Sequence, residues 1–285
     1  MAEFEDRYWT SADGLRLHFR DYAGPSDKPP VLCLHGLTRN ARDFEGIAAH
    51  LAGRWNVLCP DLRGRGDSDY ARDPNSYTPA TYVGDLNALL SQHRIERFVA
   101  IGTSLGGILT MVLAAADPDR IAGAVLNDVG PEVDRRGLDR IRGYVGQGRS
   151  FETWMHAARA LEEAHGRVFP DFLVEQWLTM AKRTMVLASN GRIVFDYDMK
   201  IAEPILAGEV VAEADAWPAW QALAGRPVLV IRGATSDILT AETAERMVAS
   251  LPGTELLTLP RVGHPPTLDE PEAVAAIDRL LARVT

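Results

Sequence analysis

The stretch that decides the fold is "FVAIGTSLGG", residues 98–107. Its first half is apolar throughout, as expected of a strand that is buried on both faces of a parallel sheet. Its second half sets Ser104 between Gly102 and Gly106, which predicts a sharp turn from strand to helix. A serine in that position is either a structural residue of a tight turn or a nucleophile held toward a substrate.

Runs of the same kind occur on both sides of this stretch. Residues 31–36 (VLCLHG) and 55–61 (WNVLCPD) precede it, and residues 121–128 (IAGAVLND) and 227–233 (PVLVIRG) follow it. Apolar strands that alternate with helical patterns indicate a parallel sheet covered by helices on both faces. We therefore expect an α/β fold with a doubly wound, mostly parallel sheet.

The alternation stops after residue 131 and resumes near residue 223. Residues 132–222 show helical periodicity and no clear buried strand, with "NGRIVFDYD" as a possible turn and extended piece. The expected organisation is a core formed by residues 1–131 and 223–285, interrupted by a helical insertion, residues 132–222.

Composition excludes several classes of partner. The net charge of −9 argues against nucleic acid and against an anionic membrane surface. No apolar run approaches the roughly 18–20 residues that span a bilayer, and the acidic N-terminus has no apolar leader. Two isolated cysteines, Cys33 and Cys59, favour buried thiols over a disulfide framework or a zinc site. We expect a cytoplasmic protein with a small-molecule substrate; the sequence does not indicate its oligomeric state.

Chemically active side chains follow several of the predicted strands. The carboxyl ends of parallel strands meet at one edge of a sheet, where ligands bind. A serine hydroxyl needs a base to take its proton, and that base needs a third group to orient it. Side chains of these types at the strand ends are His35, Ser104, Asp128, Asp237 and His264.

Five motifs in this order resemble the α/β-hydrolase fold superfamily, in particular its lid-bearing serine hydrolases. The resemblance covers nearly the whole core on both sides of the insertion. It implies an eight-stranded sheet, Ser104 as nucleophile, His264 as general base and then acid, and Asp237 as the partner of His264. The motifs are His35-Gly36, "DLRGRGDS" (residues 61–68), "GTSLGG" (residues 102–107), Asp237 and Gly263-His264.

Two further features of the site follow from the turn and from the resemblance. The turn would aim the Leu105 N–H at an anionic oxygen, and the Leu37 N–H would be the second oxyanion donor. His35 is expected to shape this loop. Asp128, which ends the predicted strand at residues 121–128, stays an alternative acid, because some members of the family take the acid from that strand. In the motif at residues 61–68, Arg65 and Asp67 are expected to be solvated charges.

The insertion is expected to form a lid over the substrate. Its Trp154, Trp177 and Met180 could line an apolar pocket together with His35 and Gly36, or the lid residues could simply pack the lid helices onto each other.

The leading hypothesis is a serine hydrolase that cleaves a small carboxylic ester, lactone or thioester through an acyl-enzyme, with no metal and no organic cofactor. Ser104 in place of an aspartate disfavours the related dehalogenases and epoxide hydrolases. A hydrolase of carbon–carbon bonds in diketone ring-cleavage products is a second hypothesis, weakened by Pro265-Pro266 after His264. A haloperoxidase-like side activity and a non-catalytic small-molecule receptor on the same fold remain open.

Overall fold

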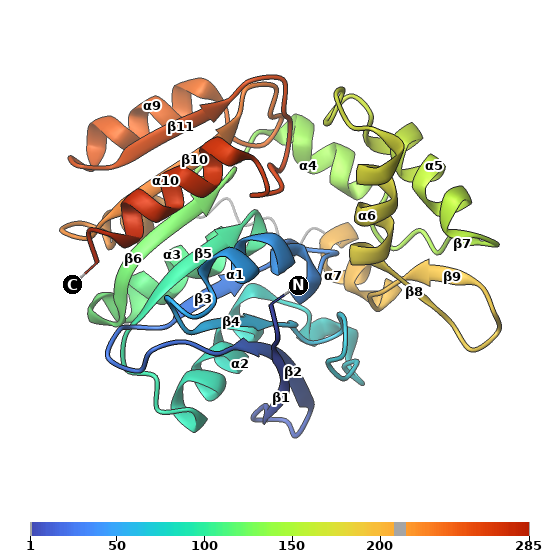
Figure 1. Ribbon diagram of the computed structural model, residues 1–285, viewed down its shortest axis with the longest axis horizontal. Coiled ribbons are helices and arrows are strands. Elements are labelled where there is room, and N and C mark those ends of the chain that lie inside the picture. The colour runs from blue at the N-terminus through green and yellow to red at the C-terminus, as the bar shows by residue number, and fades with distance from the viewer. Residues whose placement is uncertain (1, 208–214, 285) are drawn as a thin grey trace.

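One mixed sheet forms the centre of the computed structural model, which describes residues 2–207 and 215–284 (Figure 1). Its strand order is β1-β2-β4-β3-β5-β6-β10-β11. The two pairs β1–β2 and β2–β4 are antiparallel and all other neighbours are parallel, so the expected eight-stranded, mostly parallel α/β sheet is confirmed. The strands are β1 (Glu5–Thr10), β2 (Arg16–Tyr22), β3 (Val31–Leu34), β4 (Val57–Pro60), β5 (Phe98–Thr103), β6 (Ile121–Asn127), β10 (Val228–Gly233) and β11 (Glu255–Leu259).

Helices cover both faces of this sheet. Alternate residues of a strand point to opposite faces. In β3, Val31 and Cys33 pack into one apolar cluster, whereas Leu32 and Leu34 pack into another. Both faces are buried, which is why the run is apolar at every position. The first cluster includes α1 (Glu45–Leu51) and α10 (Pro271–Leu281); the second includes α2 (Pro79–Gln92), α3 (Leu105–Ala116) and α9 (Ala241–Ser250).

Threonine residues define where several helices begin. Thr78 precedes α2, and its Oγ1 accepts a hydrogen bond from the Thr81 N–H. Thr240 serves α9 in the same way through the Thr243 N–H. These side chains satisfy N–H groups that have no partner inside the helix. Short 3₁₀ turns lie at η1 (Ala41–Phe44), η2 (Pro74–Ser76), η3 (Pro118–Arg120) and η4 (Met199–Ile201).

Most of the described segment between β6 and β10 forms a smaller lobe beside the core (Figure 1), whereas its last helix, α8, packs Trp220 into the core cluster beside α3. The helices α5 and α6 of the lobe enclose an apolar cluster of their own. A small antiparallel sheet, β7-β9-β8, adds to the helices that the sequence predicted. These strands have two or three residues each, too few to produce a recognisable alternation. The elements are α4 (Arg135–Arg142), β7 (Ser150–Phe151), α5 (Trp154–His165), α6 (Val174–Thr184), β8 (Met185–Leu187), β9 (Ile193–Phe195), α7 (Ala202–Leu206) and α8 (Trp217–Gln221). No helix of the described ranges has the length and hydropathy that a bilayer crossing requires.

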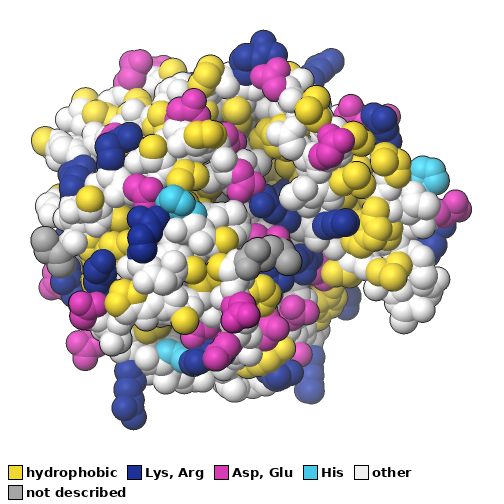
Figure 2. Space-filling view, viewed as in Figure 1, with side chains coloured by type: hydrophobic (Ala, Val, Ile, Leu, Met, Phe, Trp, Pro, Cys, Tyr) yellow, Lys and Arg dark blue, Asp and Glu magenta, His cyan; other side chains and the backbone are white. Residues whose placement is uncertain are grey.

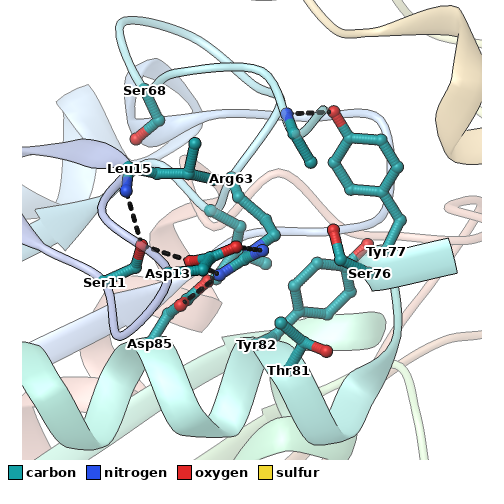
Figure 3. A network of polar contacts seen from close by, with 12 residues as sticks. Ser11, Asp13, Leu15, Arg63, Ser68, Ser76, Tyr77, Thr81, Tyr82 and Asp85 are labelled. Atoms are coloured by element: carbon teal, nitrogen blue, oxygen red, sulfur yellow. Dashed lines mark hydrogen bonds and ion pairs between the residues drawn. The ribbon is translucent and has the colours of Figure 1, made fainter. Parts of the chain in front are cut away.

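Arg63, in the loop after β4, is buried and links Asp13 of the first hairpin to Asp85 of α2 (Figure 3). Arg63 donates through Nε and Nη2 to Asp85, at 2.6 and 2.7 Å, and through Nη1 and Nη2 to Asp13, both at 2.9 Å. The Arg63 side chain is 2% exposed and that of Asp85 is 4% exposed. Asp85 is the buried partner of Arg63, and removing it would leave the buried charge with only the exposed carboxylate of Asp13.

We therefore expect Asp85→Ala to lower the free energy of unfolding by about 3 to 5 kcal/mol. Urea denaturation followed by circular dichroism measures this change. Arg279→Gln, which removes a surface ion pair with Glu255, is the control and should cause a much smaller loss. Equal losses in the two variants would contradict a structural role for the buried pair.

Candidate active site

Ser104 lies on a strained turn between β5 and α3. Its backbone has φ 52° and ψ −115°, a conformation that costs a non-glycine residue free energy. The flanking glycines permit the turn. A Cβ on Gly106 would lie 1.9 Å from the Leu34 carbonyl oxygen, and one on Gly102 would lie 2.4 Å from the Gly106 oxygen. No other residue fits at these two positions without moving the backbone.

A chain of hydrogen bonds leads from Ser104 to His264 and on to Asp128. His264 Nε2 lies 3.0 Å from Ser104 Oγ, and His264 Nδ1 lies 2.8 Å from Asp128 Oδ2. Because a carboxylate only accepts, Nδ1 carries the proton and Nε2 is left to accept the hydroxyl proton of Ser104. The three side chains come from the carboxyl ends of β5, β11 and β6. This is the geometry of a nucleophile with an oriented base.

Three donors hold the carboxylate of Asp128, which is fully buried. The Gly233 N–H donates to Oδ1 at 2.8 Å, while Ser236 Oγ at 2.6 Å and His264 Nδ1 at 2.8 Å donate to Oδ2. Two of these donors lie at the end of β10 or in the loop that follows it. That loop therefore fixes the carboxylate that orients His264.

The contacts of Asp237 correct the expectation that it is the partner of His264. Among the described residues, no hydrogen bond joins these two side chains. The Asp237 carboxylate instead accepts from Arg140 Nε at 2.5 Å and Nη2 at 2.8 Å. This bond is the main reason why the pKa of Asp237 lies below its ordinary value. The loop after β10 turns Ser236 toward Asp128 and leaves Asp237 facing α4.

His35 lies beneath the site, in a fixed tautomer. The Leu62 N–H donates to its Nε2 at 3.0 Å, so Nδ1 carries the proton and donates to the Gly36 oxygen at 2.7 Å. Burial lowers the pKa of His35 to about 4, which leaves the ring neutral at pH 7. These contacts hold His35 against the loop that follows β3 and leave its role in shaping that loop a prediction.

Arg65 also holds this loop, which corrects the expectation of a solvated charge. Its side chain is fully buried and donates to the Leu37 oxygen at 2.9 Å, the Arg63 oxygen at 2.7 Å and the Tyr82 hydroxyl at 3.0 Å. The loop approaches the turn so closely that a Cβ on Gly36 would lie 3.8 Å from Ser104 Cβ. Leu105 begins α3, where N–H groups have no partner inside the helix. The Leu37 and Leu105 N–H groups as oxyanion donors stay a prediction.

A cavity of about 720 Å³ opens over Ser104 and His264. This volume is typical of small-molecule sites. Gly36 and Met180 line the cavity, but His35, Trp154 and Trp177 are not among its described lining residues. Trp177 is buried inside the smaller lobe, and both tryptophans belong to its apolar cluster. The aromatic lining comes from other residues, Phe44, Tyr144, Phe151, Phe169, Phe172, Phe195 and Tyr197.

One group of potential metal ligands lies outside the cavity lining. His18, Asp61 and Asp67 have ligand atoms within 4.8 Å of one another. His18 Nδ1 lies 2.7 Å from Asp61 Oδ2, and the Ala41 N–H donates to Asp61 Oδ1 at 2.6 Å. Protein donors thus satisfy Asp61, and the group holds the loop after β4 in place.

Residues 29–271 match the family model described as the alpha/beta hydrolase fold. The chain belongs to this family. Its sheet order and its Gly-x-Ser-x-Gly turn between strand and helix are the features by which this hydrolase fold is recognised.

Relatives within the family are hydrolases. A crystal structure of an alpha/beta hydrolase from Novosphingobium aromaticivorans has 70% identity and a TM-score of 0.97, with both chains fully covered. The 3-hydroxybutyrate-oligomer hydrolase of Cupriavidus necator is 35% identical over 270 residues, 91% of this chain and 90% of that protein. The 2-(acetamidomethylene)succinate hydrolase of Mesorhizobium japonicum is 24% identical over 242 residues, 83% of this chain and 81% of that protein. The Cupriavidus and Mesorhizobium hydrolases are named for different substrates, so the chain is an alpha/beta hydrolase whose substrate the family does not fix.

The neutral state of His35 predicts a pH dependence of stability. The unfolded chain protonates this ring below pH 6.5, whereas the folded protein does so only near pH 4. The contribution of His35 to stability is therefore present above pH 6.5 and decreases as the pH falls toward 4, by about 3 kcal/mol at most. The difference in unfolding free energy between the wild type and His35→Gln, measured in urea at several pH values, should show this decrease. His156→Gln, at an exposed position, is the control; identical pH profiles for the wild type and His35→Gln would contradict the prediction.

Proposed function

We propose that this protein is a serine hydrolase that cleaves a small carboxylic ester through an acyl-enzyme. The hydrogen-bonded chain Ser104–His264–Asp128, with Ser104 and His264 open to the cavity, is the observation that carries this proposal. Ser104 Oγ attacks the ester carbonyl while His264 Nε2 takes its proton. The tetrahedral oxyanion accepts hydrogen bonds from the Leu37 and Leu105 N–H groups.

The remaining steps return the site to its starting state. The carbon–oxygen bond to the leaving alcohol breaks, and His264 gives the alcohol the proton it took from Ser104. A water molecule, deprotonated by His264, then attacks the acyl-enzyme, and the carboxylic acid leaves as Ser104 regains its proton. Asp128 keeps the proton on Nδ1 and stabilises the imidazolium that forms in each half of the reaction.

The substrate that we propose is a short ester of a hydroxy acid. The relative from Cupriavidus necator, which matches over nine-tenths of both chains, is a 3-hydroxybutyrate-oligomer hydrolase and supports this substrate class. The size and the mixed apolar and polar lining of the cavity suit a small, flexible molecule of this kind. Of the predicted lid, the part with α4, α5 and α6 serves as the cover of the site, because these helices supply much of the lining.

Labelling with a fluorophosphonate tests the nucleophile. Intact mass of the wild type should show one adduct, and Ser104→Ala should show none. The wild type should also hydrolyse p-nitrophenyl butyrate and the linear dimer of 3-hydroxybutyrate, which Ser104→Ala should not. A folded wild type that takes neither a fluorophosphonate nor a smaller carbamate, and that turns over no ester, would overturn the proposal and favour a receptor.

Two variants identify the acid that orients His264. Asp128→Asn should lower kcat by about 10⁴-fold, because the amide cannot hold the Nδ1–H tautomer. Asp237→Asn should lower kcat on p-nitrophenyl butyrate less than tenfold, because Asp237 makes its hydrogen bonds with Arg140. Steady-state kinetics on this neutral ester measure both. A larger loss in Asp237→Asn than in Asp128→Asn would contradict the assignment of Asp128.

A further inference from the structure

The cavity is lined by four arginines that acyl transfer does not use. Three of them pair with a carboxylate: Arg39 with Asp43, Arg140 with Asp237 and Arg183 with Asp269. Lysine and arginine side chains are visible in the hollow between the core and the smaller lobe (Figure 2). The charged lining residues are Arg39, Arg140, Arg149 and Arg183, with Asp43, Asp269 and Glu270.

Two of these arginines come from different parts of the fold. Arg39 lies in the loop after β3, two residues beyond Leu37, and Arg140 lies on α4 of the smaller lobe. Each donates through Nε and Nη2 to one carboxylate: Arg39 to Asp43 at 2.6 and 2.8 Å, and Arg140 to Asp237 at 2.5 and 2.8 Å. This geometry occupies one edge of the guanidinium. Within the described residues, no carboxylate bonds to Nη1 of either arginine, and Arg140 also forms a hydrogen bond with the Tyr144 hydroxyl. The two arginine side chains are 25% and 31% exposed, so their remaining N–H groups can reach a ligand.

Tyr144 and His165 accompany the two arginines in the cavity lining. Their rings pack edge to face with centroids 6.0 Å apart. Burial, and after it the positive charges of Arg39 and Arg140, lower the pKa of His165 to about 4. Burial raises the pKa of the Tyr144 hydroxyl above its ordinary value, and the charges of Arg140 and Arg39 offset part of this rise. His165 is therefore neutral at pH 7, and together with Tyr144 it provides uncharged hydrogen-bonding groups near two cations.

We propose that Arg39, Arg140, Tyr144 and His165 form a carboxylate subsite, which selects esters that carry a free acid group. This inference rests on the proposed ester hydrolysis and names its substrate class. A linear dimer of a hydroxy acid has one ester bond and one free carboxylate, so it can place the ester at Ser104 and the carboxylate at the subsite. Hydrogen bonds from guanidinium groups to a carboxylate are among the strong ones in proteins, and partial burial strengthens them further.

The alternative is that these ion pairs only hold the lobe on the core. Arg140–Asp237 does join α4 to the loop after β10, so it could act in that way. Arg39–Asp43 cannot, because both residues belong to the core, four positions apart in sequence. Asp237→Asn separates the two roles, because it weakens the link between lobe and core but keeps the positive charge of Arg140.

The test compares the dimer of 3-hydroxybutyrate with its methyl ester, which has the same ester bond and no free carboxylate. The wild type should have a kcat/KM at least tenfold higher for the acid. Arg140→Gln and Arg39→Gln should each lower this preference about tenfold or more, mainly through the KM of the acid. Arg142→Gln, on the same helix but paired with Asp139 and outside the cavity lining, is the matched control and should keep the preference, as should Asp237→Asn to within about threefold.

Product inhibition provides a second readout. Free 3-hydroxybutyrate should compete with p-nitrophenyl butyrate in the wild type, with an inhibition constant about tenfold higher in Arg39→Gln. This readout also covers the case in which Arg140→Gln fails to fold, as judged by circular dichroism. Equal kcat/KM values for acid and methyl ester, or variants that slow both equally, would overturn the subsite and leave the ester hydrolase standing. A wild type that takes no fluorophosphonate and hydrolyses neither compound would instead overturn the proposed function itself.

Discussion

The buried carboxylate of Asp128 is the group on which the arrangement of the site depends. It accepts hydrogen bonds from the Gly233 N–H, Ser236 Oγ and His264 Nδ1, and so connects the carboxyl end of β6 with the loops after β10 and β11. In the sequence both loops follow the smaller lobe, and Gly233 and His264 lie 105 and 136 positions after Asp128. A buried acceptor with three donors has little freedom to turn, so the position of the His264 ring relative to Ser104 follows from the packing of the sheet.

The place of Ser104 on a strand-to-helix turn could be predicted from the sequence because local patterns specify it; the catalytic roles of Ser104 and His264 stay a prediction. An uninterrupted apolar run predicts a buried strand, and glycines two positions before and after Ser104 predict the turn that the structure contains. The acid could not be identified in this way. Asp128 and Asp237 both follow a strand, and the choice depends on which side chain faces His264. Arg140, 97 positions away in the chain, engages Asp237, and no local pattern reveals that contact.

Buried arginines mark a second limit of sequence reasoning. Arg65 stands in a charged stretch that is typical of a surface loop, yet it is fully buried and holds the Leu37 carbonyl. Two backbone oxygens and the Tyr82 hydroxyl accept hydrogen bonds from its Nε and Nη1, and these partners meet only in the folded chain. The composition of the cavity lining also depends on contacts that form only in the folded chain. Trp177 and Met180 lie on one helix and belong to the same apolar cluster of the lobe, but only Met180 is also among the described residues that line the cavity.

The position of the acid has a consequence for charge in the cavity. Because Asp128 orients His264, the Asp237 carboxylate is available to hold Arg140 by two hydrogen bonds. A lone Asp237 would place a negative charge close enough to His264 for the two to interact electrostatically, and would repel an acidic substrate. Because Asp237 is paired with Arg140, it instead fixes a guanidinium whose remaining N–H donors can bind an acidic substrate. In the function that we propose, sheet packing in the core sets the reacting groups, while charges on the lobe and on the loop after β3 select the substrate.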